Sequence, residues 1–282
     1  MKTTVRFFFY LVVGVMAFAC TQDSDVPSID GMIQGDNDFI KAITSNGVIV
    51  NKYYYDEAGR IVETNGRFYF YKYIYDGNGR IEKIESAMSS AIYSSLAYDI
   101  EAITDLMTSQ NTSATNYALY TYDHSGRVSE ISNYAKPLND PDGKFEHRST
   151  RYFEYEGSLI VKSYMNDPST GQANLIYAYT YDSRGNVINE KYYSSMESKN
   201  KLSSENSYKY DDYKNPFQVM SPHYFPGIYT NPNNIVEIKF TSYEDIPESL
   251  NNTTLKQSYE YNSNGYPVKL IQDGKTVEEY VY

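Results

Sequence analysis

The stretch Tyr73-Ile74-Tyr75-Asp76-Gly77-Asn78-Gly79-Arg80-Ile81 decides the fold, because variants of it recur along the chain. Two tyrosines two positions apart place both rings on one face of a β-strand. The aspartate then opens a turn, since its side chain can bond the backbone two residues further on. The glycine three positions later supplies the left-handed conformation that closes the turn, and the β-branched residue begins the return strand. Each unit therefore predicts a β-hairpin.

Copies of this unit are spread over the whole region after residue 50. Between them stand turn signals of the tightest kind, each flanked by strand-like runs. We therefore predict an all-β fold, an antiparallel meander of about a dozen or more strands, curled into an open or closed barrel-like sheet. The copies begin at Tyr53, Tyr73, Tyr120 and Tyr179, looser ones at Tyr208 (with Asn215-Pro216 in place of Gly-Arg) and Tyr259, and a shortened one is Phe153 to Gly157; the turn signals are Asn46-Gly47, Asn65-Gly66 and Asp273-Gly274.

Two stretches interrupt the meander. Residues 89–107 carry apolar side chains three to four positions apart, from Ile92 to Met107, which predicts one short helix. Residues 217–234 are rich in proline and aromatic residues, which is typical of a long ordered loop.

The composition favours sheet and excludes some functions. Tyrosine occurs 33 times and tryptophan not at all. Tyrosine suits a half-buried pleated surface, because its ring packs while its hydroxyl reaches a polar edge. Lys2 and Arg6 are the only charges in residues 1–19, so the rest of the chain has 23 basic against 36 acidic residues, a net charge of −13. Such a surface repels phosphate backbones, and we expect no nucleic-acid binding.

The first twenty residues are typical of a bacterial export signal. A basic start is followed by the apolar run Phe7 to Phe18, which is too short to span a bilayer stably. The run ends at Ala17-Phe18-Ala19-Cys20, and Cys20 is the only cysteine of the chain. This junction resembles a bacterial lipobox, in which the cysteine receives a diacylglycerol, although Ala17 stands where the commonest pattern has Leu. The alternative is an ordinary signal peptide with an incidental cysteine.

These features predict three parts: a lipoprotein signal peptide (1–19), a lipidated Cys20 with a flexible acidic tether (20–38), and a single β domain (39–282). The stretch Thr21 to Asp25 is polar and acidic, which suits a tether. Acid behind the lipidated cysteine also resembles the tag that sends such lipoproteins to the outer face of the outer membrane. We expect lipid anchoring at the outer membrane and the cell surface, with the periplasmic face as the alternative.

The Tyr-Asp…Gly-Arg units resemble the YD repeats of Rhs-type and teneurin-type proteins, where they build a curled β-shell. The whole mature chain is similar to a Bacteroidetes lipoprotein family of unknown function with a porin-like β fold, through its lipobox, its spread units and the segment Tyr210 to Phe217 followed later by Asn233-Asn234. The resemblance covers roughly residues 36–282. The resemblance implies architecture only, because that family carries no known catalytic residues. A pore does not follow: positions between the paired tyrosines, such as Thr121, Lys209 and Glu260, are too polar to face lipid.

The sequence carries no motif of a catalytic or cofactor site. The segment Asp76 to Glu85 imitates part of a calcium-binding loop, but Ile74 stands where that loop needs its first aspartate. His124, His147 and His223 have no neighbours at metal-ligand spacing. We therefore expect a protein that is not an enzyme, with no catalytic residues, cofactors or metal. A pair of glycosidase carboxylates among the 36 acids is the alternative that stays open.

A binding or interaction module is the function that we predict. Most tyrosines follow the hairpin period, which assigns them to the core and to cross-strand ladders. Tyr224, Phe225 and Tyr229 lie in the long loop, outside the repeats, and form the candidate binding loop. The expected partner of this monomer is a glycan or another envelope protein. The alternatives are a carrier of a lipid or other apolar molecule in the lumen, and a purely structural β-shell.

Overall fold

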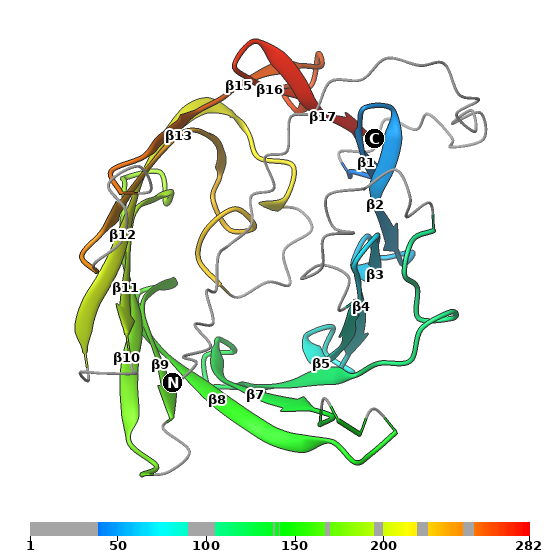
Figure 1. Ribbon diagram of the computed structural model, residues 1–282, viewed down its shortest axis with the longest axis vertical. Coiled ribbons are helices and arrows are strands. Elements are labelled where there is room, and N and C mark those ends of the chain that lie inside the picture. Colours follow the sequence, from blue (N-terminus) through cyan, green and yellow to red (C-terminus); the bar gives the residue numbers. More distant parts are fainter. Residues whose placement is uncertain are drawn as a thin grey trace, which may run out of the picture. The chain divides into compact units, whose positions relative to one another are not determined.

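The computed structural model of the chain describes residues 39–89, 105–137, 139–140, 142–166, 170–194, 200–218, 225–244 and 251–282. Within these ranges the elements are β-strands without any α-helix, and they form one nearly closed barrel-like sheet (Figure 1). The predicted all-β class and curled meander are therefore confirmed. The seventeen strands are β1 (Ala42–Ser45), β2 (Val48–Tyr55), β3 (Ile61–Gly66), β4 (Tyr69–Tyr75), β5 (Ile81–Met88), β6 (Asn116–Tyr122), β7 (Val128–Ala135), β8 (Glu146–Glu156), β9 (Leu159–Asn166), β10 (Ala173–Tyr181), β11 (Val187–Ser194), β12 (Lys201–Lys214), β13 (Asn233–Ser242), β14 (Thr254–Lys256), β15 (Ser258–Tyr261), β16 (Pro267–Gln272) and β17 (Lys275–Val281).

The sheet follows the order of the chain, and each strand from β1 to β13 pairs antiparallel with the next one. The ring closes where β17 pairs with β1, with Ala42 opposite Val281. Between these, β14 and β15 are successive parts of one strand, of which β14 pairs with β13 and β15 with β16. At the break, the side chains of Gln257 and Tyr259 both donate to the carbonyl of Ile235. These side chains, together with the backbone bond from the N–H of Gln257 to the carbonyl of Val236, connect the two strands at this break.

The repeat turns have the geometry that their sequence predicts. The carboxylate of Asp76 accepts hydrogen bonds from the backbone N–H groups of Asn78 and Arg80, both at 2.9 Å. Gly79 donates its N–H to the carbonyl of Asp76 and has a φ of 77°, which a side chain would strain. The same arrangement recurs at Asp56 and Asp123. The Asp-to-Gly bend therefore reverses the chain at each of these units.

Of the three predicted two-residue turns, two are confirmed and one is wrong. Asn46-Gly47 and Asp273-Gly274 have positive φ at both residues, as tight hairpins require. Asn65-Gly66 instead forms the end of β3, and the chain turns at Arg67-Phe68. A Cβ at Gly66 would lie 2.8 Å from the ring of Tyr69, so this glycine serves close packing rather than a turn.

The two predicted interruptions differ in outcome. The helix predicted near 89–107 falls largely on residues 90–104, which lie outside the described residues, and Ser89 and Asp105 to Met107 are not helical. The long loop predicted after Phe217 is described from Phe225 onward and is irregular until β13 begins at Asn233.

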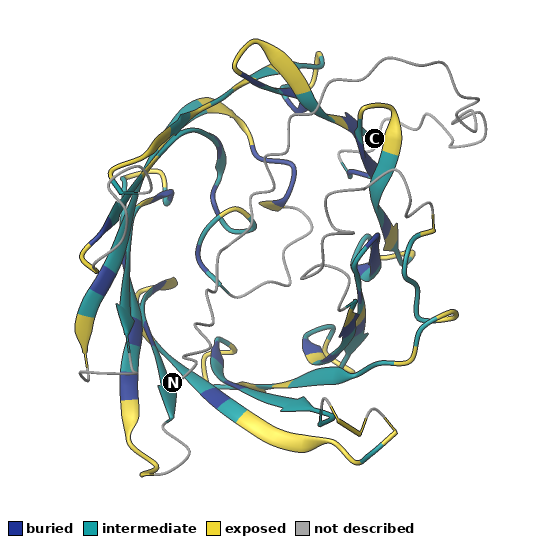
Figure 2. Cartoon of the chain, in the orientation of Figure 1, coloured by how far each residue is buried: buried dark blue, intermediate teal, exposed yellow. Residues whose placement is uncertain are grey.

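The paired tyrosines face the inside of the barrel, which we call the lumen. Tyr53, Tyr73 and Tyr179 are buried. Tyr53 and Tyr73 pack with the residues that begin return strands, such as Ile61 and Ile81. Alternation along each strand leaves the intervening positions on the outer face, and many of these residues are polar. Figure 2 shows how buried, intermediate and exposed residues are distributed along the strands. Exposed members of this outer set are Tyr54, Thr121, Thr180, Lys209 and Glu260.

Candidate functional site

A ladder of tyrosine hydroxyls joins each repeat to the one before it. The hydroxyl of Tyr75 donates to the carbonyl of Ile61 at 2.7 Å, the residue that begins the preceding return strand. The guanidinium of Arg60 pairs with Asp56 at 2.6 Å and lies 4.5 Å from the ring centroid of Tyr75. The Asp and the Arg of one unit and the second Tyr of the next unit therefore hold neighbouring repeats together. The same hydroxyl contact joins Tyr55 to Ile40, Tyr122 to Ile81, Tyr155 to Val128, Tyr181 to Ile160, Tyr210 to Val187 and Tyr282 to Pro267.

The described parts of the long loop after β12, residues 215–218 and 225–232, lie inside the ring of strands (Figure 1). Phe217 packs edge-on against Tyr229 and against Tyr280 of β17, with ring centroids 5.7 and 6.2 Å apart. Phe225 packs against Phe153 of β8, with centroids 6.0 Å apart. The loop therefore contacts two different walls of the barrel from within.

Two of the three candidate binding-loop residues lie in the described part of this loop. Phe225 and Tyr229 are half-buried and face the lumen, whereas Tyr224 lies outside the described residues. Phe225 belongs to the side of the lumen lined by β8, and Tyr229 packs with the core near β4 and β17. A binding role for these residues stays a prediction.

The Asn215-Pro216 departure from the repeat pattern builds the entrance to this loop. The amide of Asn215 donates to the carbonyls of Ile228 and Asn231, across the base of the loop. Asn231 is fully buried; its side-chain oxygen accepts the N–H of Val187 at 2.9 Å, and its amide donates to the Tyr210 hydroxyl. Buried amides with all these partners hold the loop firmly to β11 and β12.

The lumen wall formed by β8 to β12 combines charged and aromatic side chains. Arg151 of β8 lies over the ring of Phe225, 4.5 Å from its centroid, and 5.7 Å from that of Tyr177 of β10. Burial raises the pKa of Tyr177 to about 12. Burial also raises the pKa of Glu190 of β11, although the amide of Asn206 donates to its carboxylate at 3.2 Å. This wall can offer a cation, a carboxylate and ring faces to a polar molecule.

The opposite wall, around β17, is more apolar. Burial raises the pKa of Glu278, whose carboxylate accepts a hydrogen bond from the hydroxyl of Tyr280 at 3.0 Å. Burial raises the pKa of Tyr229 to about 12, and burial also raises the pKa of the neighbouring Tyr53. Tyr229 and Tyr53 therefore stay protonated over the pH range where ordinary tyrosines ionise, which suits a packed core.

A second aromatic assembly lies on the outside of the barrel. Tyr117 of β6 and Tyr134 of β7 stack with their centroids 4.7 Å apart, and Phe145 lies edge-on to Tyr117 at 4.8 Å. We call these three residues the outer-wall aromatic group. Lys83 lies over Tyr117, and the adjacent Leu119 is 37% exposed, while Phe145 is 36% exposed. The sequence analysis missed this group. The sequence does contain a signal for it: Tyr117 is an odd number of positions from the inward-facing repeat tyrosines of its strand. Its side chain must therefore point to the outer face.

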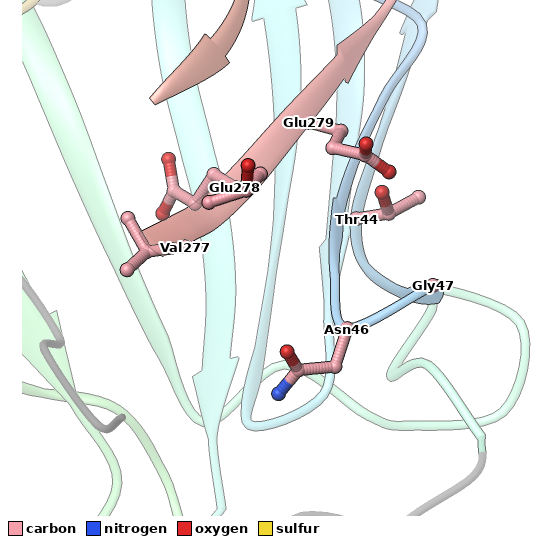
Figure 3. Close-up of a pocket in the computed structure, with 7 residues that line it drawn as sticks. Thr44, Asn46, Gly47, Val277, Glu278 and Glu279 are labelled. Atoms are coloured by element: carbon pink, nitrogen blue, oxygen red, sulfur yellow. The ribbon is translucent and has the colours of Figure 1, made fainter. Parts of the chain in front are cut away.

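A small pocket of about 230 Å³ lies where β17 meets the first hairpin. Thr44, Asn46 and Gly47 line it from the hairpin, and residues 276–279 line it from β17. Figure 3 shows Glu279 on the side of Thr44 and Glu278 on the other side of the strand. Ligand pockets span roughly 300 to 1,000 Å³ and are mostly apolar, so this pocket does not suit a lipid.

The other predicted positions contribute little to a site. Cys20 and His223 lie outside the described residues. His124 is exposed in a repeat turn, and His147 bonds the Thr150 hydroxyl on the outer face. In the described part of the chain, no group of three or more His, Cys, Asp or Glu residues could hold a metal ion. The same part contains no helix of sufficient length and apolarity to cross a membrane.

No protein-family model and no curated protein matches the chain. Among solved structures, it is similar to a porin-like protein from Bacteroides vulgatus, with a TM-score of 0.47 and 11% identity over 86% of this chain and 98% of that one. A porin-like protein from Bacteroides uniformis gives a TM-score of 0.35 and 10% identity over 86% of this chain and 97% of that one. The TcdB2-TccC3 structure gives a TM-score of 0.20 and 13% identity over 83% of this chain and 17% of that one. No residue role passes from these proteins to this chain.

Proposed function

We propose that this chain is a lipid-anchored protein of the outer membrane, displayed at the cell surface, and that it acts as a non-enzymatic binding module. The anchor is Cys20, whose place after a basic start and a short apolar run supports lipidation. The partner is a glycan or another envelope protein. The barrel is the rigid scaffold that presents the contact surface, because the tyrosine ladder ties neighbouring repeats together.

The observation that carries this proposal is the outer-wall aromatic group. Aromatic side chains on the outer face expose part of their apolar surface to water. This exposure is unfavourable unless a partner covers the surface. Tyr117 of β6, Tyr134 of β7 and Phe145, which directly precedes β8, form a contiguous set, and Leu119 extends it. Tyrosine and phenylalanine are enriched at the centres of binding surfaces and suit the apolar faces of sugars.

The same geometry weighs against the carrier function. Phe217, Phe225 and Tyr229, from the described parts of the long loop, lie in the lumen and pack on β8 and β17. An apolar ligand would have to displace these contacts. We therefore assign this binding function to the outer face of the barrel, and not to the carriage of an apolar molecule in its lumen.

A glycan array and a pull-down from envelope extract test the proposal. The Tyr117→Ala and Phe145→Ala variants are expected to weaken capture by about tenfold or more, as central aromatic contacts do. Tyr54→Ala is the matched control, because Tyr54 also lies on the outer face and is 45% exposed. Equal capture by all three variants would rule out the outer-wall site, and cleavage of a bound glycan would contradict the non-enzymatic assignment.

Fractionation of cells tests the location separately. Cys20→Ser is expected to release the protein from the membrane fraction, because the thiol that accepts the lipid is gone. Protease added to intact cells should digest the wild-type protein. Membrane retention of the variant would contradict the anchor, and complete protection of the wild type would contradict surface display.

A further inference from the structure

Arg151 is an unusual residue of the lumen, because its charge has no carboxylate partner among the residues that the structure describes. Its position on β8 is in phase with Phe153 and Tyr155, which pack with the inward-facing core. Phe225 of the long loop covers one side of the Arg151 guanidinium, whose carbon lies 4.5 Å from the ring centroid. The side chain is half-buried, so it keeps access to solvent.

Five other arginines provide the contrast. Arg60, Arg80, Arg127, Arg148 and Arg184 each lie within 4 Å of a carboxylate. Within the described ranges, the guanidinium of Arg151 makes neither a hydrogen bond nor an ion pair, and it lies over the rings of Tyr177 and Phe225. A guanidinium has five N–H donors, and half-burial without acceptors is costly. The chain has 36 acidic residues, and an arginine that pairs with none of the described ones points to an anion from outside.

The groups around Arg151 define what that anion carries. Tyr177 lies 5.7 Å from the guanidinium, and Tyr192 lies 5.3 Å from Tyr177 between ring centroids. Glu190, opposite Tyr179 in the ladder, and Asn206, opposite Glu190, add an acceptor and a donor on the same wall. Ser163, between Phe153 and Tyr177 in register, is fully buried and its hydroxyl lacks a partner among the described groups. Rings beside hydroxyl-bonding groups suit a sugar, because a sugar has an apolar face and a polar edge.

We propose that this wall of the lumen binds an acidic sugar, with Arg151 holding its carboxylate. The planar guanidinium matches a carboxylate by two parallel hydrogen bonds. Tyr177 and Tyr192 receive the apolar face of the sugar ring, while Glu190 and Asn206 bond its hydroxyls. This site is separate from the outer-wall aromatic group and does not depend on the function proposed for it.

Isothermal titration of the full-length protein tests the site, with trigalacturonate and a glucuronate oligomer as probes. Neutral galactotriose and inorganic phosphate are the comparison ligands. The wild type is expected to bind at least one uronate more tightly than either comparison ligand. Arg151→Gln should weaken that binding by about ten- to a hundredfold, the loss expected for a charged hydrogen-bonded pair. Arg148→Gln is the matched control, because Arg148 lies on the same strand and already pairs with Glu146 at 3.1 Å.

The Arg151→Lys variant is the control for a folding defect, because it keeps the positive charge and removes the planar guanidinium. It should also weaken uronate binding, while its melting temperature stays that of the wild type. Four results would overturn the proposal: no binding of either uronate, equal binding of phosphate, binding unchanged in a folded Arg151→Gln protein, or weakening as large in Arg148→Gln. Loss of uronate binding in Tyr117→Ala, with Arg151→Gln unaffected, would also overturn it and assign the sugar to the outer wall.

Discussion

Removal of one hydroxyl from the tyrosine ladder tests whether the ladder stabilises the barrel. In Tyr75→Phe the ring stays in place under the guanidinium of Arg60, but the 2.7 Å hydrogen bond to the carbonyl of Ile61 is lost. Ile61 is only 2% exposed, so its carbonyl gains little from water. A lost hydrogen bond together with an unsatisfied acceptor costs about 1 to 2 kcal/mol of the free energy of unfolding.

Urea denaturation and thermal unfolding measure this cost. For a domain of this size, each kcal/mol lowers the melting temperature by about 2 to 4 °C, so Tyr75→Phe should melt about 2 to 8 °C below the wild type. Tyr54→Phe is the control, because Tyr54 is on the outer face and 45% exposed. Its free energy of unfolding should stay within about 0.5 kcal/mol of the wild type. If both variants unfold alike, the hydroxyl ladder does not stabilise the barrel and our account of the repeat is refuted.

Three further predictions concern the turns and the buried groups. Gly126→Ala should cost about 1 to 2 kcal/mol, because Gly126 has a φ of 78° with open space around it, whereas Gly77→Ala, without a positive φ, should cost little; equal unfolding midpoints would contradict this. Since burial raises the pKa of Glu278, ionisation makes the fold less stable as the pH rises above the ordinary value of 4.5. Glu278→Gln should therefore raise the melting temperature at pH 8 and leave it unchanged near pH 4, and the reverse pH dependence would be inconsistent with a buried carboxyl. Burial raises the pKa of Tyr177 and of Tyr229 to about 12, so in an absorbance titration these tyrosines should ionise only well above pH 10. Ionisation of all 33 tyrosines together near pH 10 in the folded protein would show that they are exposed.

The hairpins could be predicted from the sequence because the interactions that form them are local. Asp76 bonds backbone groups two and four positions on, and Gly79 must adopt a positive φ at a fixed distance after it. Such contacts leave residues at constant spacing, which a sequence displays directly. The alternation of paired tyrosines with Thr121, Lys209 and Glu260 likewise determined which face points inward.

The tertiary structure decided the rest, because the contacts involved join residues far apart in the chain. Asn65-Gly66 has the composition of a turn, but the ring of Tyr69 uses the missing Cβ for packing. Ring closure sets Ala42 opposite Val281, and the inner loop sets Phe225 on Arg151. In each of these contacts the two residues are far apart in the chain, and no fixed spacing in the sequence relates them. The sequence by itself thus determined the hairpins and their faces, while only the packing of the whole barrel decided how the ring closes, what fills it and which side chains stay without partners.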